Sequence, residues 1–234
     1  MAENSLHTIT KDAELRDMAR RSFGYGCWNA PYWFIGPEQG QSRHEQDDLT
    51  DRLNAWKDFG CRDLDDCRKC HHYLGVNTWH RPTPRLQPTW RPLILLLMVF
   101  KGKDSDNEAL RRYHRDEWGS LNGETCVIEL SGLAAHDLRV PRDRDSWICE
   151  RVAFIREQIL SNKPRVVVMY GTGSDRAWNA IAAPETLVLG NAACHLGTLF
   201  VMVPHPASRR FKNEDWRRIG ADLRRKSEIV QQGL

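Results

Sequence analysis

The spacing of hydrophobic and polar residues predicts a chain in which short strands alternate with helices. Four apolar runs have the length and composition of buried strands, at 32–35, 125–130, 165–170 and 199–203. Apolar residues at helical spacing predict helices from Thr10, through Leu49, Leu53 and Trp56, at 107–118, at 146–161, through Trp178 and Ile181, and from about Asn213. The apolar run at 92–101 fits either a helix or a strand, because periodicity does not separate the two there.

The order of these elements indicates the fold class. Strands that alternate with helices favour a three-layer α/β fold around a central, mainly parallel four-stranded sheet. The β-branched run at 165–170 is typical of a central parallel strand. The 234 residues are enough for one sizeable core, and we expect a single domain over 1–234. In such sheets the functional loops follow the carboxyl ends of the strands, which here are 36–40, 129–132, 171–174 and 204–210.

The composition is that of an ordinary globular protein. Hydrophobic residues make up 41% and charged residues 28% of the chain, and no apolar segment is long enough to span a bilayer. No basic segment followed by an apolar one opens the sequence as in a secretory signal, so we expect a cytoplasmic protein without membrane contact. The seven cysteines are an odd number, and a reducing compartment favours free thiols or metal ligands over disulfides.

The distribution of charge is more informative than the net charge of +3. Basic residues gather in the C-terminal segment, as Arg209, Arg210, Lys212, Arg217, Arg218, Arg224, Arg225 and Lys226. A solvated helix face accounts for such a cluster. Beside a site that handles a polyanion, the same side chains would contact phosphates.

Two of the four junctions carry short motifs that occur together in one enzyme family. The first strand runs into Gly-Pro-Glu-Gln-Gly at 36–40, and the last strand runs into His-Pro-Ala-Ser at 205–208. Between them, the strand segment 127–131 and the hydrophobic run that ends at Gly171 follow in the same order. This ordered set resembles the uracil-DNA glycosylase superfamily over roughly residues 32–220. The resemblance implies a base excision repair enzyme that flips uracil out of DNA and hydrolyses its N-glycosidic bond.

The resemblance also assigns roles to residues of the two loops. His205 would donate an N–H to uracil O2 as negative charge builds on the leaving base, and Glu38, or else Gln39, would hold the attacking water. A loop histidine bound to a nearby carbonyl and a solvent-facing glutamate are the plainer alternatives. The substrate would be bound by Gly36, Pro37, Gln39, Gly40, Glu129 and Ser131, and the DNA by Ser208, Arg209 and Arg210.

Glu129 stands where the resembled family carries a base-reading asparagine. One amide supplies both the acceptor for uracil N3–H and the donor for O4, whereas an ionised carboxylate would repel O4. Either Glu129 is protonated, or it reads the base in another way, or the amide comes from elsewhere. A structural carboxylate paired with an arginine is the alternative. The aromatic face on which a flipped base stacks has candidates at Trp56, at Phe59 and around Trp79.

A short cysteine-rich segment gathers potential metal ligands. Cys67 and Cys70 have metal-ligand spacing, and Cys61, His71 and His72 lie nearby. Some branches of the resembled superfamily hold an iron–sulfur cluster on four cysteines, but the other cysteines of this chain are scattered along it. We expect free cysteines and no cofactor. The alternative is an iron–sulfur cluster or zinc at Cys61, Cys67, Cys70 and His71.

These features together predict a monofunctional uracil-DNA glycosylase that acts as a monomer on uracil-containing DNA, single- or double-stranded. The main alternative is a DNA-binding relative of the same fold that lacks catalysis, which is supported by Glu129 and by Gln39 in place of the motif proline. A small-molecule nucleotide-binding enzyme is a weaker alternative, since Tyr-Gly-Thr-Gly-Ser at 170–174 follows a buried strand.

Overall fold

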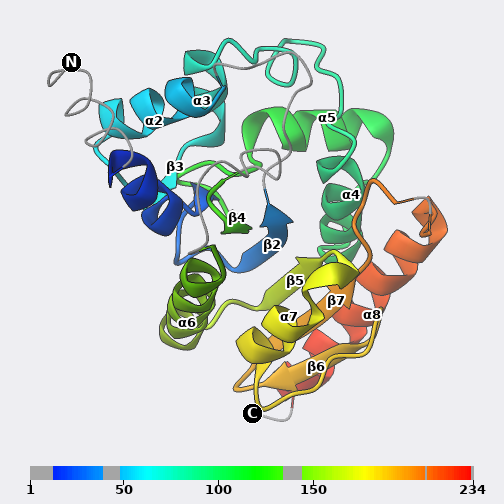
Figure 1. Cartoon of the computed structure of the whole chain (residues 1–234). Coiled ribbons are helices and arrows are strands. Elements are labelled where there is room, and N and C mark those ends of the chain that lie inside the picture. The colour runs from blue at the N-terminus through cyan, green and yellow to red at the C-terminus, as the bar shows by residue number, and fades with distance from the viewer. Residues whose placement is uncertain (1–12, 39–47, 134–143, 209, 233–234) are drawn as a thin grey trace, which may run out of the picture.

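A seven-stranded mixed sheet forms the centre of the part of the chain that the structure describes (Figure 1). The structure is a computed structural model, and it describes residues 13–38, 48–133, 144–208 and 210–232. The strands follow the order β3-β1-β4-β2-β5-β7-β6 across the sheet. Their bounds are β1 Gly24–Gly26, β2 Tyr32–Glu38, β3 Leu64–Asp65, β4 Thr125–Ser131, β5 Val166–Tyr170, β6 Ala192–His195 and β7 Thr198–Val203.

The four strands that the hydrophobic pattern predicts lie next to one another at the centre of the sheet. They are β4, β2, β5 and β7, and each is parallel to its neighbour in this row. Both faces of these strands are covered, since Phe34, Ile35, Val167 and Val168 are at most 1% exposed. Burial on two faces explains why their sequences are continuous apolar runs rather than alternating patterns. The α/β class is therefore confirmed.

The prediction of a four-stranded sheet is wrong in the number of strands, because three short strands extend the sheet. β1 pairs antiparallel with β4, β3 pairs parallel with β1, and β6 pairs antiparallel with β7. A strand of two to four residues is too short to show a period-two pattern. Gly24 and Gly26 of β1 have positive φ, and a Cβ on Gly24 would clash with the main-chain carbonyl of Val127. The absence of a side chain at these two glycines therefore allows β1 to pair closely with β4.

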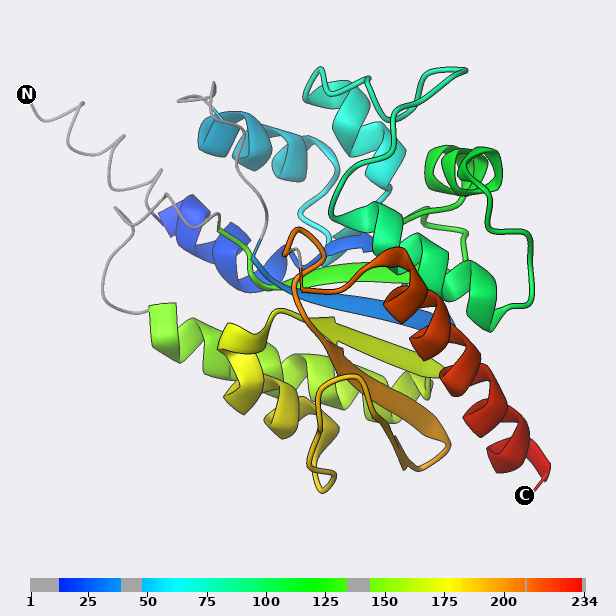
Figure 2. The same cartoon turned by 90° about the vertical axis from the view of Figure 1, so that its right-hand side faces the viewer.

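Helices cover both faces of the sheet and complete three layers (Figure 2). α6 and α7 pack on one face, and α4, α5 and α8 pack on the other. A helix over 13–21 precedes β1. The other bounds are α2 Asp48–Asp58, α3 Cys67–Tyr73, α4 Trp90–Phe100, α5 Asn107–Asp116, α6 Arg144–Asn162, α7 Asp175–Ala182 and α8 Asn213–Gln232. Within the described ranges, no helix has both the length and the apolar character that a membrane crossing requires.

The apolar run at 92–101, which periodicity does not assign to a helix or a strand, lies almost entirely in the helix α4. Its residues are buried on nearly every side, because α4 packs against the sheet, α5 and α8. Gly220 of α8 lies so close to α4 that a Cβ there would be 2.5 Å from the main-chain oxygen of Leu96. A helix that is apolar all round is a buried helix, and for that reason it lacks the one-sided pattern that identifies an amphipathic helix.

Arg151 on α6 joins the first described helix to the end of β4. Its guanidinium donates to the main-chain carbonyls of Glu129 and Leu130, at 2.7 Å each. It also donates, at 3.0 Å each, to the carbonyls of Ala19, Arg20 and Ser22. Carbonyls at the end of a helix have no partner within it, and a positive charge is favourable there. Arg151 is only 2% exposed, so its bonds lie in the interior.

We expect Arg151→Met to lower the free energy of unfolding by at least about 3 kcal/mol, because several buried carbonyl groups lose their donor. Urea denaturation at neutral pH measures the loss. Arg156→Met on the same helix is the matched control, since Arg156 donates to the carbonyl of Ala180 at an exposed position. Its loss should amount to no more than about 1 kcal/mol. Equal losses for the two variants would contradict the anchoring role of Arg151.

Candidate active site at the carboxyl edge of the sheet

The four parallel strands end at one edge of the sheet, so their following loops meet there. Gly36 of β2 pairs with Glu129 of β4, and Tyr170 of β5 pairs with Val203 of β7. Side chains two residues apart on a strand point to the same face. Glu129 and Tyr170 therefore lie on the same face as the core residues that pack against α4 and α8.

A buried carboxyl group lies at this edge. The hydroxyl of Tyr170 donates to Oε1 of Glu129 at 2.9 Å. Oε2 is buried and has no hydrogen-bond partner among the described residues. Burial raises the pKa of Glu129 to about 8 and the charge of Glu38 also raises it, whereas the Tyr170 hydrogen bond and the charge of Arg151 lower it. Glu129 is therefore mainly a neutral acid at pH 7, with one O–H donor and one carbonyl acceptor.

Two of the interpretations that the sequence allows for Glu129 are a carboxylate paired with an arginine and a protonated acid. Arg151 donates to the main-chain carbonyl of Glu129. No salt bridge between described residues includes the Glu129 carboxyl group. The alternative of a structural carboxylate paired with an arginine is therefore not what the structure contains, and the protonated form is the one that fits.

Gly36 makes room for this acid. A Cβ at position 36 would overlap Oε2 of Glu129 and the hydroxyl of Tyr170. The sequence predicts that Gly36 lets the main chain approach a base or phosphate. In the structure the glycine allows two protein side chains to meet over the strand.

His205 follows β7 and lies beside Tyr170, with the two ring centres 5.7 Å apart. Its Nδ1 accepts a hydrogen bond from the main-chain N–H of Ala207 at 3.2 Å, so the proton of the neutral ring is on Nε2. Burial lowers the pKa of His205, whereas the carboxylate of Glu38 raises it. At pH 7 His205 is therefore a neutral ring with an N–H donor, and Glu38 lies close enough to act on its charge.

A cavity of about 330 Å³ opens between the loops that follow β2, β5 and β7, and we call it the polar cavity after the hydroxyl, imidazole and guanidinium groups among its lining residues. The loop 171–174 lines it together with Pro37, Pro204, His205, Ser208 and Arg210. Hydroxyl groups and an arginine are the side chains that bind phosphate oxygens. Four residues that the resemblance assigns to substrate and DNA thus line one cavity, namely Pro37, His205, Ser208 and Arg210.

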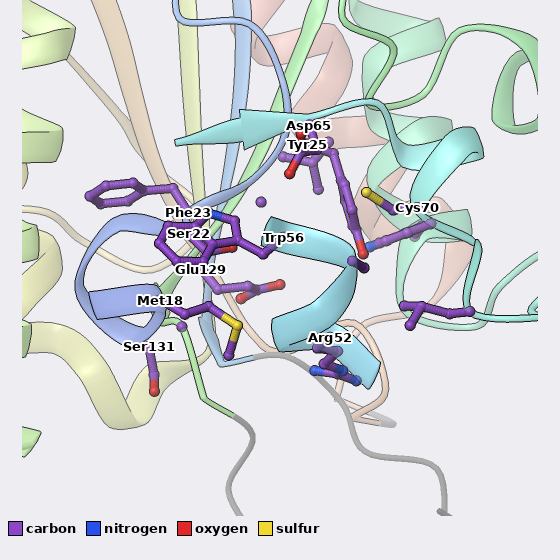
Figure 3. Close-up of a pocket in the computed structure, with 16 residues that line it drawn as sticks. Met18, Ser22, Phe23, Tyr25, Arg52, Trp56, Asp65, Cys70, Glu129 and Ser131 are labelled. Carbon is purple, nitrogen blue, oxygen red and sulfur yellow. The ribbon is translucent and has the colours of Figure 1, made fainter. Parts of the chain in front are cut away.

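An aromatic cavity of about 80 Å³ contains the carboxyl group of Glu129, which points into it (Figure 3). This volume is several times what one water molecule needs. Aromatic side chains from β1 and its flank, α2 and α4 form much of the wall, as Phe23, Tyr25, Trp56 and Trp90. Figure 3 also shows Met18 and Arg52, which line the same cavity. The cavity offers flat apolar faces next to a hydrogen-bonding acid.

Sequence reasoning found only part of this aromatic wall. Trp56 lines the cavity, whereas Phe59 contacts Tyr73 and Trp79 lies near His114. The residues that it missed lie outside the recognised motifs, as Phe23, Tyr25 and Trp90. The alternation Phe-Gly-Tyr-Gly at 23–26 was the available signal, since close main-chain packing at glycines places the intervening aromatic side chains.

Tyr170 connects the two cavities, because it contacts Glu129 in one and His205 in the other. Ser131 also lines the aromatic cavity, but its hydroxyl is bound to the main chain of Leu133. It donates to the Leu133 carbonyl at 2.8 Å and accepts from the Leu133 N–H at 3.2 Å. Glu38 is not among the described residues that line either cavity. Gln39, Gly40 and Arg209 lie outside the described residues.

The cysteine-rich segment forms a separate group of potential metal ligands. Cys67, Cys70 and His71 lie on α3. Cys67 and His71 are one helical turn apart and share a face, and both lie close to His80. Cys61 packs in another cluster, with Leu15, Leu53 and Trp56 among its members. The predicted set of four ligands is therefore not brought together, and in the described part of the chain the group that forms is Cys67, His71 and His80.

The fold and the two cavities define an α/β protein with an ionisable, aromatic-lined site at the carboxyl edge of its parallel strands. No protein-family model matches the chain, and no curated protein matches it. The function is therefore argued from the chemistry of the site.

Glu129→Gln tests the neutral carboxyl group. The Glu129 carboxyl ionises near 4.5 when exposed and near 8 in the folded protein. Because the unfolded state releases this proton first, wild-type stability falls as pH rises from about 5 to about 8 and falls no further above that. Glutamine cannot ionise, so the variant should gain stability over wild type across this range, by up to about 5 kcal/mol. Urea denaturation at both ends of the range measures the change, and a constant difference would contradict a buried neutral acid.

Proposed function

We propose that the protein is a DNA glycosylase that hydrolyses the N-glycosidic bond of uracil flipped out of DNA and leaves an abasic site. The observation that carries the proposal is the connection, through Tyr170, of a neutral Glu129 in an aromatic cavity with His205 in a polar cavity. Base removal needs a pocket for the flipped base, a hydrogen-bond donor to the leaving base and side chains that bind the phosphate backbone.

Glu129 supports recognition of the uracil edge. In its neutral form it has an O–H that can donate to O4 and a carbonyl oxygen that can accept from N3–H, the two functions of an amide. Its Oε2 has no partner among the described residues, which is unfavourable for a buried polar atom until a ligand binds. Trp56 and Phe23 line the same cavity and offer faces on which a pyrimidine can stack.

His205 and Glu38 supply the chemistry of the proposed reaction. As the bond between C1′ and N1 breaks, negative charge develops on O2 of the base and positive charge develops on the sugar. The Nε2–H of His205 donates to O2. The Glu38 carboxylate stabilises the sugar and takes a proton from the water whose oxygen bonds to C1′. That proton then neutralises the uracil anion, and no cofactor takes part.

The polar cavity supports phosphate binding next to the base. Ser208 and Arg210 come shortly after His205 in the chain, and they line the same cavity as Thr172 and Ser174. Contacts of this kind fix the position of a nucleotide without reading its sequence.

A DNA-binding protein without catalysis is the second candidate, and the position of Glu38 outside the two lining sets favours it. Incubation with single- and double-stranded oligonucleotides that carry one uracil, followed by alkaline cleavage of abasic sites, separates the two. Abasic sites support the glycosylase. Binding without cleavage at any enzyme excess supports the second candidate, and the absence of both rejects both.

His205→Ala should reduce the single-turnover rate of uracil release at least about 100-fold, the effect of losing one donor to a developing oxyanion. His195→Ala is the matched control, because His195 lies on β6 at the far edge of the sheet and is also partly buried. The control should react at the wild-type rate. A rate near wild type for His205→Ala would remove this residue from the mechanism.

Arg210→Ala should weaken binding to all DNA sequences alike and reduce the slope of log affinity against log salt by about 1, as expected for one lost phosphate contact. Fluorescence anisotropy over a range of salt concentrations measures the slope. Arg225→Ala is the matched control. It removes an exposed arginine of α8 and should leave the slope unchanged. A slope that changes in the control and not in Arg210→Ala would contradict phosphate binding in the polar cavity.

A further inference from the structure

A group of metal-binding side chains lies behind the wall of the aromatic cavity, on α3 and on the loop between α3 and α4. Sγ of Cys67 lies 3.8 Å from Nδ1 of His71, and this nitrogen lies 2.8 Å from Nε2 of His80. The three ligand atoms lie within 4.8 Å of one another, and all three side chains are buried. Asp66 caps α3 through the main-chain N–H of Lys69 and so fixes the helix at the residue before Cys67.

Two of the three ligand distances are close to those of a tetrahedral zinc site. Bonds of about 2.3 Å to sulfur and 2.05 Å to nitrogen place sulfur and nitrogen about 3.6 Å apart, two nitrogens about 3.3 Å apart and two imidazole centres about 5.2 Å apart. The ring centres of His71 and His80 are 5.0 Å apart. A metal ion requires their nitrogens to separate by roughly half an ångström, which a small side-chain rotation provides.

Two unpaired nitrogen atoms lie beside this group, since both ring nitrogens of His114 are buried without a hydrogen-bond partner among the described residues. Such atoms are rare in folded proteins and unfavourable. His114, on α5, is 1% exposed, and its ring centre lies 6.3 Å from that of His80. That separation is about 1 Å longer than for two ligands of one ion, so His114 is near enough to become a ligand.

The chemistry of the ligands selects the metal. A thiol and imidazoles suit zinc, whereas magnesium and calcium require oxygen ligands. The ring of Trp90 stacks on His71 at 5.6 Å, and the ring of Tyr25 lies 5.7 Å from it. These aromatic neighbours exclude water and restrict the rotation of the imidazole.

We propose that Cys67, His71 and His80 bind one zinc ion, and that His114 takes the fourth position. The Cys67 thiol releases its proton as the zinc–sulfur bond forms, and nothing is oxidised or reduced. The ion connects α3, the loop that carries His80, and α5. Because α3 also supplies Cys70 to the wall of the aromatic cavity, the ion holds that wall in place. A site with four protein ligands is structural.

Elemental analysis of protein purified without chelator tests the site. We expect about one zinc per wild-type chain, and a melting temperature that falls on chelation and recovers when zinc is added. Cys67→Ser, His71→Gln and His80→Gln should lose the zinc. His72→Gln is the matched control: the His72 ring centre lies 6.1 Å from that of His80, but the side chain is exposed and outside the three-ligand group, so this variant should keep the zinc. His114→Gln should weaken zinc binding at least about tenfold, and unchanged binding would remove His114 from the site.

Cobalt substitution gives a readout that does not depend on stability. Cobalt added to metal-free wild-type protein should produce a thiolate-to-metal charge-transfer band in the near ultraviolet, and Cys67→Ser should lack it. The proposal is overturned if wild-type protein holds less than about 0.1 zinc per chain and gains no thermal stability from added zinc. It is also overturned if His72→Gln loses as much zinc as His71→Gln.

Discussion

Hydrogen bonds from one buried guanidinium hold the candidate active site together. Arg151 donates to the carbonyls of Glu129 and Leu130 on β4 and to carbonyls at the end of the helix over 13–21. Both segments form walls of the aromatic cavity. The planar fork of an arginine binds several fixed acceptors at once, and it sets the spacing between two segments that lie far apart in the chain. Arg151 thus adds to the hold that sheet pairing with Gly36 and a hydrogen bond to the carbonyl of Phe23 have on Glu129.

The protonation states of the groups at the carboxyl edge of the sheet follow from burial rather than from ion pairs. Burial raises the pKa of Glu129 and lowers that of His205, so both groups are neutral at pH 7. Burial and the neighbouring Glu129 also raise the pKa of Tyr170, which therefore remains a donor. Neutral donors and acceptors bind a neutral base without the desolvation that a buried charge would require. An acid at position 129 can then take the place of an amide, which explains how the departure from the family pattern is compatible with the proposed function.

The central strands and most helices were predictable because their signals are local. Phe34 and Val168 lie in apolar runs of strand length, and the stripe of Ile155 and Ile159 marks a helix. The aromatic cavity was not predictable in the same way. Tyr25 comes from a three-residue strand between glycines, and Trp90 from a helix that is apolar on nearly all sides. Neither segment has a one-sided pattern, because Gly24 packs closely on the main chain of β4 and α4 is enclosed by the sheet, α5 and α8.

By itself, the sequence determined the parallel strands and the loops at their carboxyl ends, because periodicity and turn residues act over a few neighbouring positions. Only the tertiary structure decided that Glu129 is neutral, that Gly36 makes room for it, and that His80 rather than Cys61 joins Cys67 and His71. Each of these properties depends on burial and on distances between segments far apart in the chain. Such distances arise only when the layers pack, and no local pattern of residues encodes them.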